Sequence, residues 1–383
     1  MKIMKKVLLL IVGALMALTP VHAEGLLNEP LRFVEADSVV FLSQDMSNYR
    51  LMALTLDSTV LSLPFTPKKY SRKAFEKHTK AWHTHFANHF NLVGGADNED
   101  TEPQRSAAIA ALYAGAELFL QTGSAQYANA IERIAQNALP TALGARSTAE
   151  RKVGARALID AAGMIYATDE EGVYVNLYTN SFARIHTPRL AFSLDVQTMM
   201  PYEARVKIRV GGLKSGRHHF KLRLLIPEWC NAQIAPTEKY AASAQRTESL
   251  VVYINGRDEE LQVRDGYVVV ERAWRNGEEV YFDLPFPILT IKNKLAENGA
   301  QEFVALQRGP LVYALTQPTE AFALDTQQKI EVDYSGHVAD VPCLLGGLKE
   351  KESTSERSEV LGKNFVAVPY SLFPGQVWIP VAE

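Results

Sequence analysis

The stretch that decides the fold is Gln301–Tyr313, which reads Gln-Glu-Phe-Val-Ala-Leu-Gln-Arg-Gly-Pro-Leu-Val-Tyr. Apolar residues lie on both sides of Gly309-Pro310, a pair that is typical of a turn. We expect this stretch to belong to a β-domain. Gln307 and Arg308 would then serve strand and turn geometry before the Gly-Pro pair.

Short segments of alternating apolar and polar residues recur through the second half of the chain. They are 172–178, 205–210, 220–226, 250–254 and 267–271, with 366–369 and 377–381 as closing strands. Turn pairs such as Asn255-Gly256 and Asp265-Gly266 separate them and supply the positive φ angles of tight hairpins. Many short strands at regular spacing predict an antiparallel β-sandwich.

The first half has a helical pattern from Leu26 to about Ala167, with apolar residues at spacings of three and four. The expected helices are 47–63, 71–90, 105–121, 125–139 and 149–167. Ser71 is the expected N-cap of the second helix. Pro64 and Pro140 are expected to end the first and fourth, because proline cannot continue an inner helical turn.

The length of 383 residues predicts two or three domains. The formal net charge of -3 provides no electrostatic basis for binding nucleic acid or an anionic membrane. We therefore expect neither as a partner.

The N-terminus predicts a secretory signal peptide at residues 1–23. Lys2, Lys5 and Lys6 precede an apolar run, Val7–Leu18, and small residues lead to a cleavage point after Ala23. The run is short for a membrane span of about 20 residues. An uncleaved anchor is the alternative interpretation. The expectation is secretion across the inner membrane, a periplasmic location and no membrane contact after cleavage.

The sequence contains two cysteines, Cys230 and Cys343. Disulfides persist in exported proteins, so the two could pair, or both could be buried free thiols. Their wide separation does not fit the close paired spacing of zinc motifs.

The β-rich half resembles glycoside hydrolase family 127, the β-L-arabinofuranosidase-like proteins. The segments that carry the likeness, in the family's order, are Gly172–Tyr178, Leu225–Cys230, Trp274–Val280, Asp283–Pro287 and Gln301–Tyr313. The resemblance covers roughly residues 172–381.

The helical half is similar to the family in fragments, namely Leu118–Gly123, Tyr127–Asn129 with Glu132-Arg133, Ala155–Leu158 and Gly163–Tyr166. The family's helices form an (α/α)6 barrel, which needs more chain than this region provides. The resemblance therefore implies an α+β multidomain protein, with a truncated (α/α) barrel-like remnant at 24–170 and antiparallel β-sandwich domains at 171–383.

The resemblance also implies a mechanism, in which a zinc-bound cysteine attacks the sugar and a glutamate exchanges the proton. The family's Glu-x-Cys motif falls on Gln104 and Ser106, and its paired cysteines fall on Ala149 and Glu150. Glutamine cannot act as a carboxylic acid, serine is a poor zinc ligand and alanine is none. We therefore predict no catalytic residue from the family's set and no zinc cofactor.

Two replacement sites are open as hypotheses. Glu99 and Glu102, near the first eroded motif, and Glu150 could form a relocated carboxylate pair, or could simply be solvated acids. His78, His85 and His89 have helical spacings of seven and four and could chelate a metal, although phenylalanines accompany them and favour packing.

Exposed aromatic rings could bind sugar, and Trp82, Trp229, Trp274 and Trp378 are the candidates. Burial in the core is the favoured interpretation for the last three. The leading hypothesis is a catalytically degenerate homologue with a carbohydrate-related binding or structural role. The alternatives are an active glycosidase with relocated carboxylates and a subunit of a periplasmic assembly whose partner supplies the missing helices.

Overall fold

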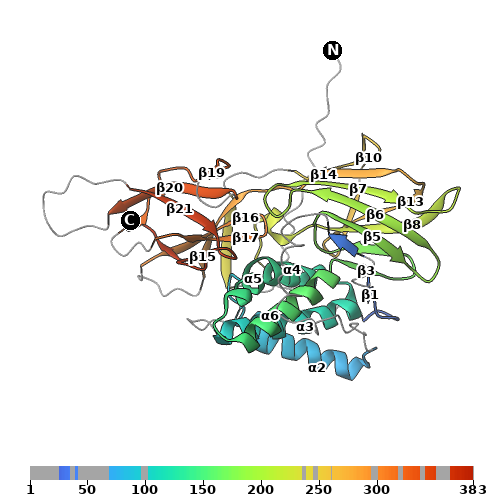
Figure 1. Ribbon diagram of the computed structural model, residues 1–383, viewed down its shortest axis with the longest axis horizontal. Coiled ribbons are helices and arrows are strands. Elements are labelled where there is room, and N and C mark those ends of the chain that lie inside the picture. The colour runs from blue at the N-terminus through green and yellow to red at the C-terminus, as the bar shows by residue number, and fades with distance from the viewer. Residues whose placement is uncertain are drawn as a thin grey trace, which may run out of the picture.

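The computed structural model describes residues 26–34, 39–41, 69–95, 102–234, 239–244, 249–259, 261–294, 301–317, 322–336, 341–350 and 363–382. Figure 1 shows two β lobes next to each other, with a layer of helices packed on one side of them. The predicted signal peptide and the predicted helix 47–63 lie outside the described residues.

The helical layer contains α2 (Arg72–Trp82), the π-helical turn η2 (His83–Ala87), α3 (Glu102–Thr122), α4 (Ala125–Arg133), the π-helical turn η3 (Ile134–Ala138), α5 (Leu139–Thr141), the 3-10 turn η4 (Ala142–Gly144) and α6 (Thr148–Gly163). Ser71 is the N-cap of α2, as predicted, and its side chain accepts a hydrogen bond of 3.2 Å from the amide of Ala74.

Two helix ends differ from the prediction. Pro140 does not end its helix, because it stands near the start of the short α5, directly after the π turn η3, where a missing amide donor is tolerated. The predicted helix 149–167 ends at Gly163. Tyr166–Thr168 instead forms β3, since its backbone pairs with β1 and β4.

A six-stranded sheet has the order β1-β3-β4-β8-β13-β12. Its strands are β1 (Arg32–Phe33), β3 (Tyr166–Thr168), β4 (Gly172–Val175), β8 (His218–Leu225), β12 (Gln262–Arg264) and β13 (Tyr267–Trp274). The β4–β8 pair is parallel and the other pairs are antiparallel. The expectation of purely antiparallel sheets is therefore wrong at this pair.

A seven-stranded antiparallel sheet has the order β11-β10-β14-β7-β6-β5-β2. Its strands are β2 (Val39–Phe41), β5 (Ser181–His186), β6 (Ala191–Thr198), β7 (Arg205–Gly211), β10 (Val251–Ile254), β11 (Arg257–Asp258) and β14 (Glu279–Asp283). Asn255 and Gly256 have φ angles of 52° and 78°, so the predicted tight hairpin turn between β10 and β11 is confirmed.

A nine-stranded sheet forms the C-terminal lobe, at the left of Figure 1. Its strands are β9 (Tyr240–Ala244), β15 (Ile288–Asn293), β16 (Phe303–Arg308), β17 (Leu311–Leu315), β18 (Phe322–Leu324), β19 (Glu331–Asp333), β20 (Cys343–Glu350), β21 (Lys363–Pro369) and β22 (Ile379–Pro380). The stretch Gln301–Tyr313 contains the β16–β17 hairpin, with Gly309 at a φ of 56° in its turn.

Two large hydrophobic cores and one small cluster, Ala155 with Ile159 on α6, lie among the described residues. The largest core joins the helical layer to the six- and seven-stranded sheets and to part of the nine-stranded sheet, and the second core lies within the C-terminal lobe. The protein is thus mostly β with few helices. β1, β2 and β3 come from the part of the chain whose pattern is helical, so the expectation of helix throughout that part is wrong at these strands.

Candidate functional site

A buried polar cluster lies where the helical layer meets both β lobes. Arg133, at the end of α4, is only 3% exposed, and its guanidinium donates three hydrogen bonds. Nη1 donates to the Leu92 carbonyl (3.0 Å) and to Oε1 of Gln307 (3.1 Å), and Nη2 donates to Oε1 of Glu228 (2.8 Å). We define the motif junction as these charged and polar side chains together with their neighbours: Asn129, Glu132, Arg133, Asn137, Glu228, Trp229 and Gln307.

Glu132 is the second buried acid of the motif junction and is 3% exposed. Its Oε2 accepts a hydrogen bond of 2.9 Å from the indole nitrogen of Trp229. Burial raises the pKa of Glu132 to about 8, and the nearby charge of Glu228 adds to the rise. The hydrogen bond from Trp229 and the charge of Arg133 oppose it.

Two asparagines complete the contacts of the helices with the β lobes. Asn137 donates to the carbonyl of Pro310 (2.9 Å) and accepts from the amide of Val312 (2.8 Å), so it binds the β16–β17 turn directly. Asn129 accepts from the amide of Glu228 (3.3 Å). Three segments that resemble the family therefore meet at one place. They are the segment in α4, the turn η5 (Glu228–Asn231) and the β16–β17 hairpin.

The sequence contained a signal for this cluster that the prediction missed. Asn129, Arg133 and Asn137 follow one another at spacings of four, a spacing that in a regular helix predicts three polar side chains on one face. Buried polar groups need partners, so such a row predicts a polar surface opposite it.

Arg308 follows Gln307 of the motif junction at the end of β16 and contacts other parts of the chain. Its guanidinium donates to the carbonyl of Tyr202 (2.8 Å) and to the phenol oxygen of Tyr334 (2.7 Å), and it lies 4.5 Å from the centre of the Phe286 ring. Gln307 also donates to the carbonyl of Gly309 (2.8 Å). Gln307 thus has a role in turn geometry, as predicted, whereas the side chain of Arg308 ties the end of β16 to other parts of the chain.

The predicted positions of the eroded catalytic motifs lie at two neighbouring helix starts. Gln104 and Ser106 are in the first turns of α3, and Ala149 and Glu150 are in the first turn of α6. Nη2 of Arg105 lies 3.5 Å from Oε2 of Glu150, and both side chains are 22% exposed. The structure thus brings the two segments together through an ion pair, while Ser106 and Ala149 are exposed.

Comparison with known proteins supports the kinship. Residues 172–286 match the family model described as beta-L-arabinofuranosidase, GH127 middle domain. The resemblance to family 127 is confirmed. No curated protein matches the sequence significantly.

Solved structures show the same fold over most of the chain. A GH127 β-arabinofuranosidase designated BT3674 matches 90% of this chain at 20% identity with a TM-score of 0.69. A GH127 β-L-arabinofuranosidase from Geobacillus stearothermophilus T6 matches 90% of this chain at 18% identity with a TM-score of 0.66. A protein described as a glycoside hydrolase matches 88% of this chain at 16% identity, also with a TM-score of 0.66. The chain spans 60–65% of the length of these three structures.

The carboxylates proposed as a relocated family 127 site are only partly placed. Glu99 lies outside the described residues, and Glu102 begins α3 without a described side chain. Glu150 is engaged by Arg105. The distance between carboxyl groups that separates retaining from inverting glycosidases is therefore not defined for these residues.

The three histidines proposed as metal ligands are all exposed. His85 lies in the π turn η2 and His89 lies beyond it, so the spacing of four no longer follows α-helical geometry. His78 stacks on Tyr70, with ring centres 4.6 Å apart. Within the described ranges, no group of three or more His, Cys, Asp or Glu side chains could hold a metal ion.

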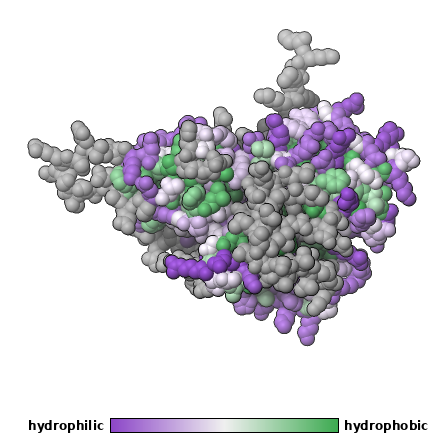
Figure 2. Space-filling view, in the orientation of Figure 1, coloured by the Kyte–Doolittle hydropathy of each residue, from purple (hydrophilic) through white to green (hydrophobic). Residues whose placement is uncertain are grey.

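The tryptophans proposed as sugar-binding residues are not the aromatic side chains that the described surface exposes. Trp82, Trp229 and Trp274 are buried, which confirms the core interpretation for the last two, while Trp378 is half-buried against Tyr240. Figure 2 shows hydrophobic surface on the C-terminal lobe at the left. The exposed aromatic side chains among the described residues are Phe303, Tyr334 and Phe373, all from this lobe.

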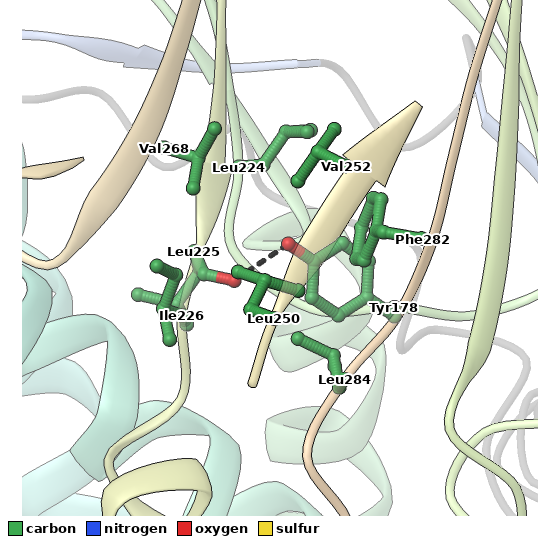
Figure 3. Close-up of a pocket in the computed structure, with 9 residues that line it drawn as sticks. All are labelled: Tyr178, Leu224, Leu225, Ile226, Leu250, Val252, Val268, Phe282 and Leu284. Atoms are coloured by element: carbon green, nitrogen blue, oxygen red, sulfur yellow. Dashed lines mark hydrogen bonds between the residues drawn. The ribbon is translucent and has the colours of Figure 1, made fainter. Parts of the chain in front are cut away.

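An apolar pocket lies between the six- and seven-stranded sheets (Figure 3). Leu224, Val252, Val268 and Phe282 are among its lining residues. The phenol of Tyr178 points into it and donates to the carbonyl of Leu225 at 2.6 Å. Because its polar group already has a partner and its other walls are apolar, the pocket offers packing space rather than chemistry.

The two cysteines are free and buried, so they do not form a disulfide. Cys230 lies in η5 and Cys343 begins β20. Neither lies at the helix starts where the family 127 resemblance puts its cysteines. No helix in the described part of the chain is both long and apolar enough to cross a membrane.

Proposed function

We propose that this chain is an exported, periplasmic relative of the family 127 glycosidases that does not use the family's zinc–cysteine chemistry. Its role would be carbohydrate-related binding or structural. The helices of residues 24–170 would be a shortened remnant of the family's barrel. The chain's similarity to only part of each related structure supports this interpretation.

One observation carries the proposal. The helix starts to which we assign the family's zinc-binding motifs are bridged by the Arg105–Glu150 ion pair. A guanidinium and a carboxylate there cannot supply a thiolate, which is both the nucleophile and the zinc ligand in the implied mechanism. The sequence's two cysteines are buried in the β lobes, where burial raises the pKa of Cys230 and Cys343 and disfavours the thiolate.

A hydrolysis screen of the mature protein tests the proposal, with zinc measured in the same samples. We expect no zinc-dependent turnover of an aryl β-L-arabinofuranoside and no stoichiometric zinc. Stoichiometric zinc together with turnover would overturn the proposed loss of the mechanism. Calorimetric titration with arabinofuranosyl oligosaccharides then separates a binding role from a purely structural one.

A reconstitution experiment tests the placement of the eroded site. The quadruple variant Gln104→Glu, Ser106→Cys, Ala149→Cys and Glu150→Cys restores the implied ligand set at the two helix starts. We expect it to bind about one zinc ion per chain, because the three thiolates and one carboxylate introduced at the two helix starts are ligand types that suit zinc's tetrahedral preference. The matched control keeps Ser106 and should bind zinc more weakly. A quadruple variant that folds but binds no zinc would show that these helix starts are not the former site.

The relocated-carboxylate alternative makes a separate prediction. Activity should then be independent of zinc and should be lost in Glu99→Gln, Glu102→Gln or Glu150→Gln. The assembly alternative needs an apolar surface on the helices, and Val153 is the one large apolar side chain that the described helices expose. A partner recovered from periplasmic extract by size measurement would favour it.

A further inference from the structure

The motif junction contains more acid than base. It holds two carboxyl groups, on Glu132 and Glu228, and one guanidinium, on Arg133, and all three side chains are nine-tenths or more buried. An uncompensated charge in a protein interior is expensive, so a buried group of this kind tends to take up a proton instead.

The hydrogen bonds show which of the two carboxyl groups the Arg133 guanidinium pairs with. Arg133 directs its bonds to Leu92, Gln307 and Glu228, with the Glu228 pair at 2.8 Å. Glu132 instead accepts from the neutral indole of Trp229. The cation is therefore committed to Glu228, and Glu132 is the acid that has to be neutral.

The other titratable groups around Glu132 do not change this balance. Glu228 and Cys230 face it from η5, Tyr178 faces it from the segment after β4, and Arg133 is next to it on α4. Burial raises the pKa of the Cys230 thiol and of the Tyr178 phenol well above their ordinary values, so both are neutral near pH 7. No second cation is among the groups that act on Glu132.

We propose that the motif junction is a proton-binding site, with the proton on Glu132, and that losing this proton loosens the contact between the helical layer and the β lobes. The inference does not depend on whether the protein has enzymatic activity. It concerns the surface that joins α4 to η5 and to the β16–β17 hairpin.

The direction of the effect follows from the pKa values. Glu132 titrates near pH 8 when the junction is closed and near 4.5, its ordinary value, when it is open to water. The closed state therefore binds the proton more tightly between these values. Opening should become easier as the pH rises through this window, by about tenfold per pH unit, and should then level off.

Cys230 is a built-in reporter, because it lies buried in η5 directly after Trp229 of the junction. In the Cys343→Ser background, the labelling rate of Cys230 by a thiol reagent reports opening. The ratio of this rate to that of the same protein carrying Glu132→Gln cancels the reagent's own pH dependence. We expect the ratio to rise about tenfold per unit from pH 5 to pH 8. A ratio that does not change with pH would overturn the proposal.

Two further variants keep the test decisive if Glu132→Gln folds poorly. Glu228→Gln leaves one carboxyl group for one guanidinium, so Glu132 can ionise and the pH dependence of opening should shrink. Glu203→Gln, at an exposed glutamate, should leave it unchanged. A Glu228→Gln protein that keeps the full slope would contradict the charge balance.

The second thiol separates local opening from global unfolding. In the Cys230→Ser background, Cys343 reports on the C-terminal lobe, where it is buried in β20. Global unfolding also exposes Glu132 to water and therefore has the same dependence on pH, so the size of the labelling rate separates the two processes. We expect Cys343 to be labelled much more slowly than Cys230 at every pH, because opening of the junction alone does not expose it. Equal labelling rates at both cysteines would mean that the whole protein unfolds, and the proposed loosening of one junction would be wrong.

Discussion

Arg133→Met should cost about 3–5 kcal/mol of unfolding free energy, the range for breaking a buried ion pair by removing one partner. Methionine keeps a long apolar stem, so the cavity is small, but all three of the guanidinium's hydrogen bonds are lost. The largest loss is the 2.8 Å contact with Glu228, because that carboxylate stays buried at 6% exposure without its cation. Against a typical stability of roughly 5–15 kcal/mol, this is a large fraction.

Urea denaturation followed by tryptophan fluorescence measures the effect, because Trp229 lies in the same junction. The matched control is the double variant Arg133→Met with Glu228→Gln, which removes the unpaired charge and should recover part of the loss. A loss below about 1 kcal/mol for the single variant would refute the reasoning, since it would equal that of one ordinary hydrogen bond. A double variant less stable than the single one would do the same.

Three further predictions concern the same region. Gly309→Ala should lower the free energy of unfolding by about 3 kcal/mol in urea denaturation, because Gly309 has a φ of 56° and the new Cβ would lie 2.2 Å from the Phe286 ring. The control Gly163→Ala, which has open space around its Cβ, should be neutral or slightly stabilising. Asn137→Ala should cost about 3 kcal/mol, because it leaves buried backbone groups of the β16–β17 turn without their partner; a thermal melt unchanged from the wild type would contradict this. The unfolding free energy should fall by about 1.4 kcal/mol per unit as the pH rises from about 4.5 to about 8, because the pKa of Glu132 is raised in the folded state, and Glu132→Gln should remove this component.

The features that local chemistry specifies could be predicted from the sequence. Asn255-Gly256 and Asp265-Gly266 both adopt the positive φ angles that their hairpins need, and Ser71 caps its helix. These elements depend on neighbours within a few positions of the chain. The prediction was wrong where distant partners decide. Tyr166–Thr168 has a helical pattern in sequence, but becomes β3 because β1 and β4 are available on both sides of it.

The candidate site shows the same division. Kinship could be inferred from the segments at η5 and the β16–β17 hairpin, yet the bond between Arg133 and Gln307 joins residues 174 positions apart. No pattern in one sequence reveals such a pair, because it depends on how the helical layer packs on the lobes. The π turn in η2 was equally hidden, and it removes the regular spacing that favoured a histidine metal site.

The strands β1, β2 and β3 determine which residues an isolated fragment of the protein must include. They precede residue 172, where the match to the family 127 middle domain begins, yet β3 pairs with β4 and β2 pairs with β5. A fragment cut at residues 172–286 would therefore leave one side of β4 and one side of β5 without hydrogen-bond partners. Unpaired strand edges recruit other chains, so such a fragment should self-associate, and including the preceding strands should keep it dispersed.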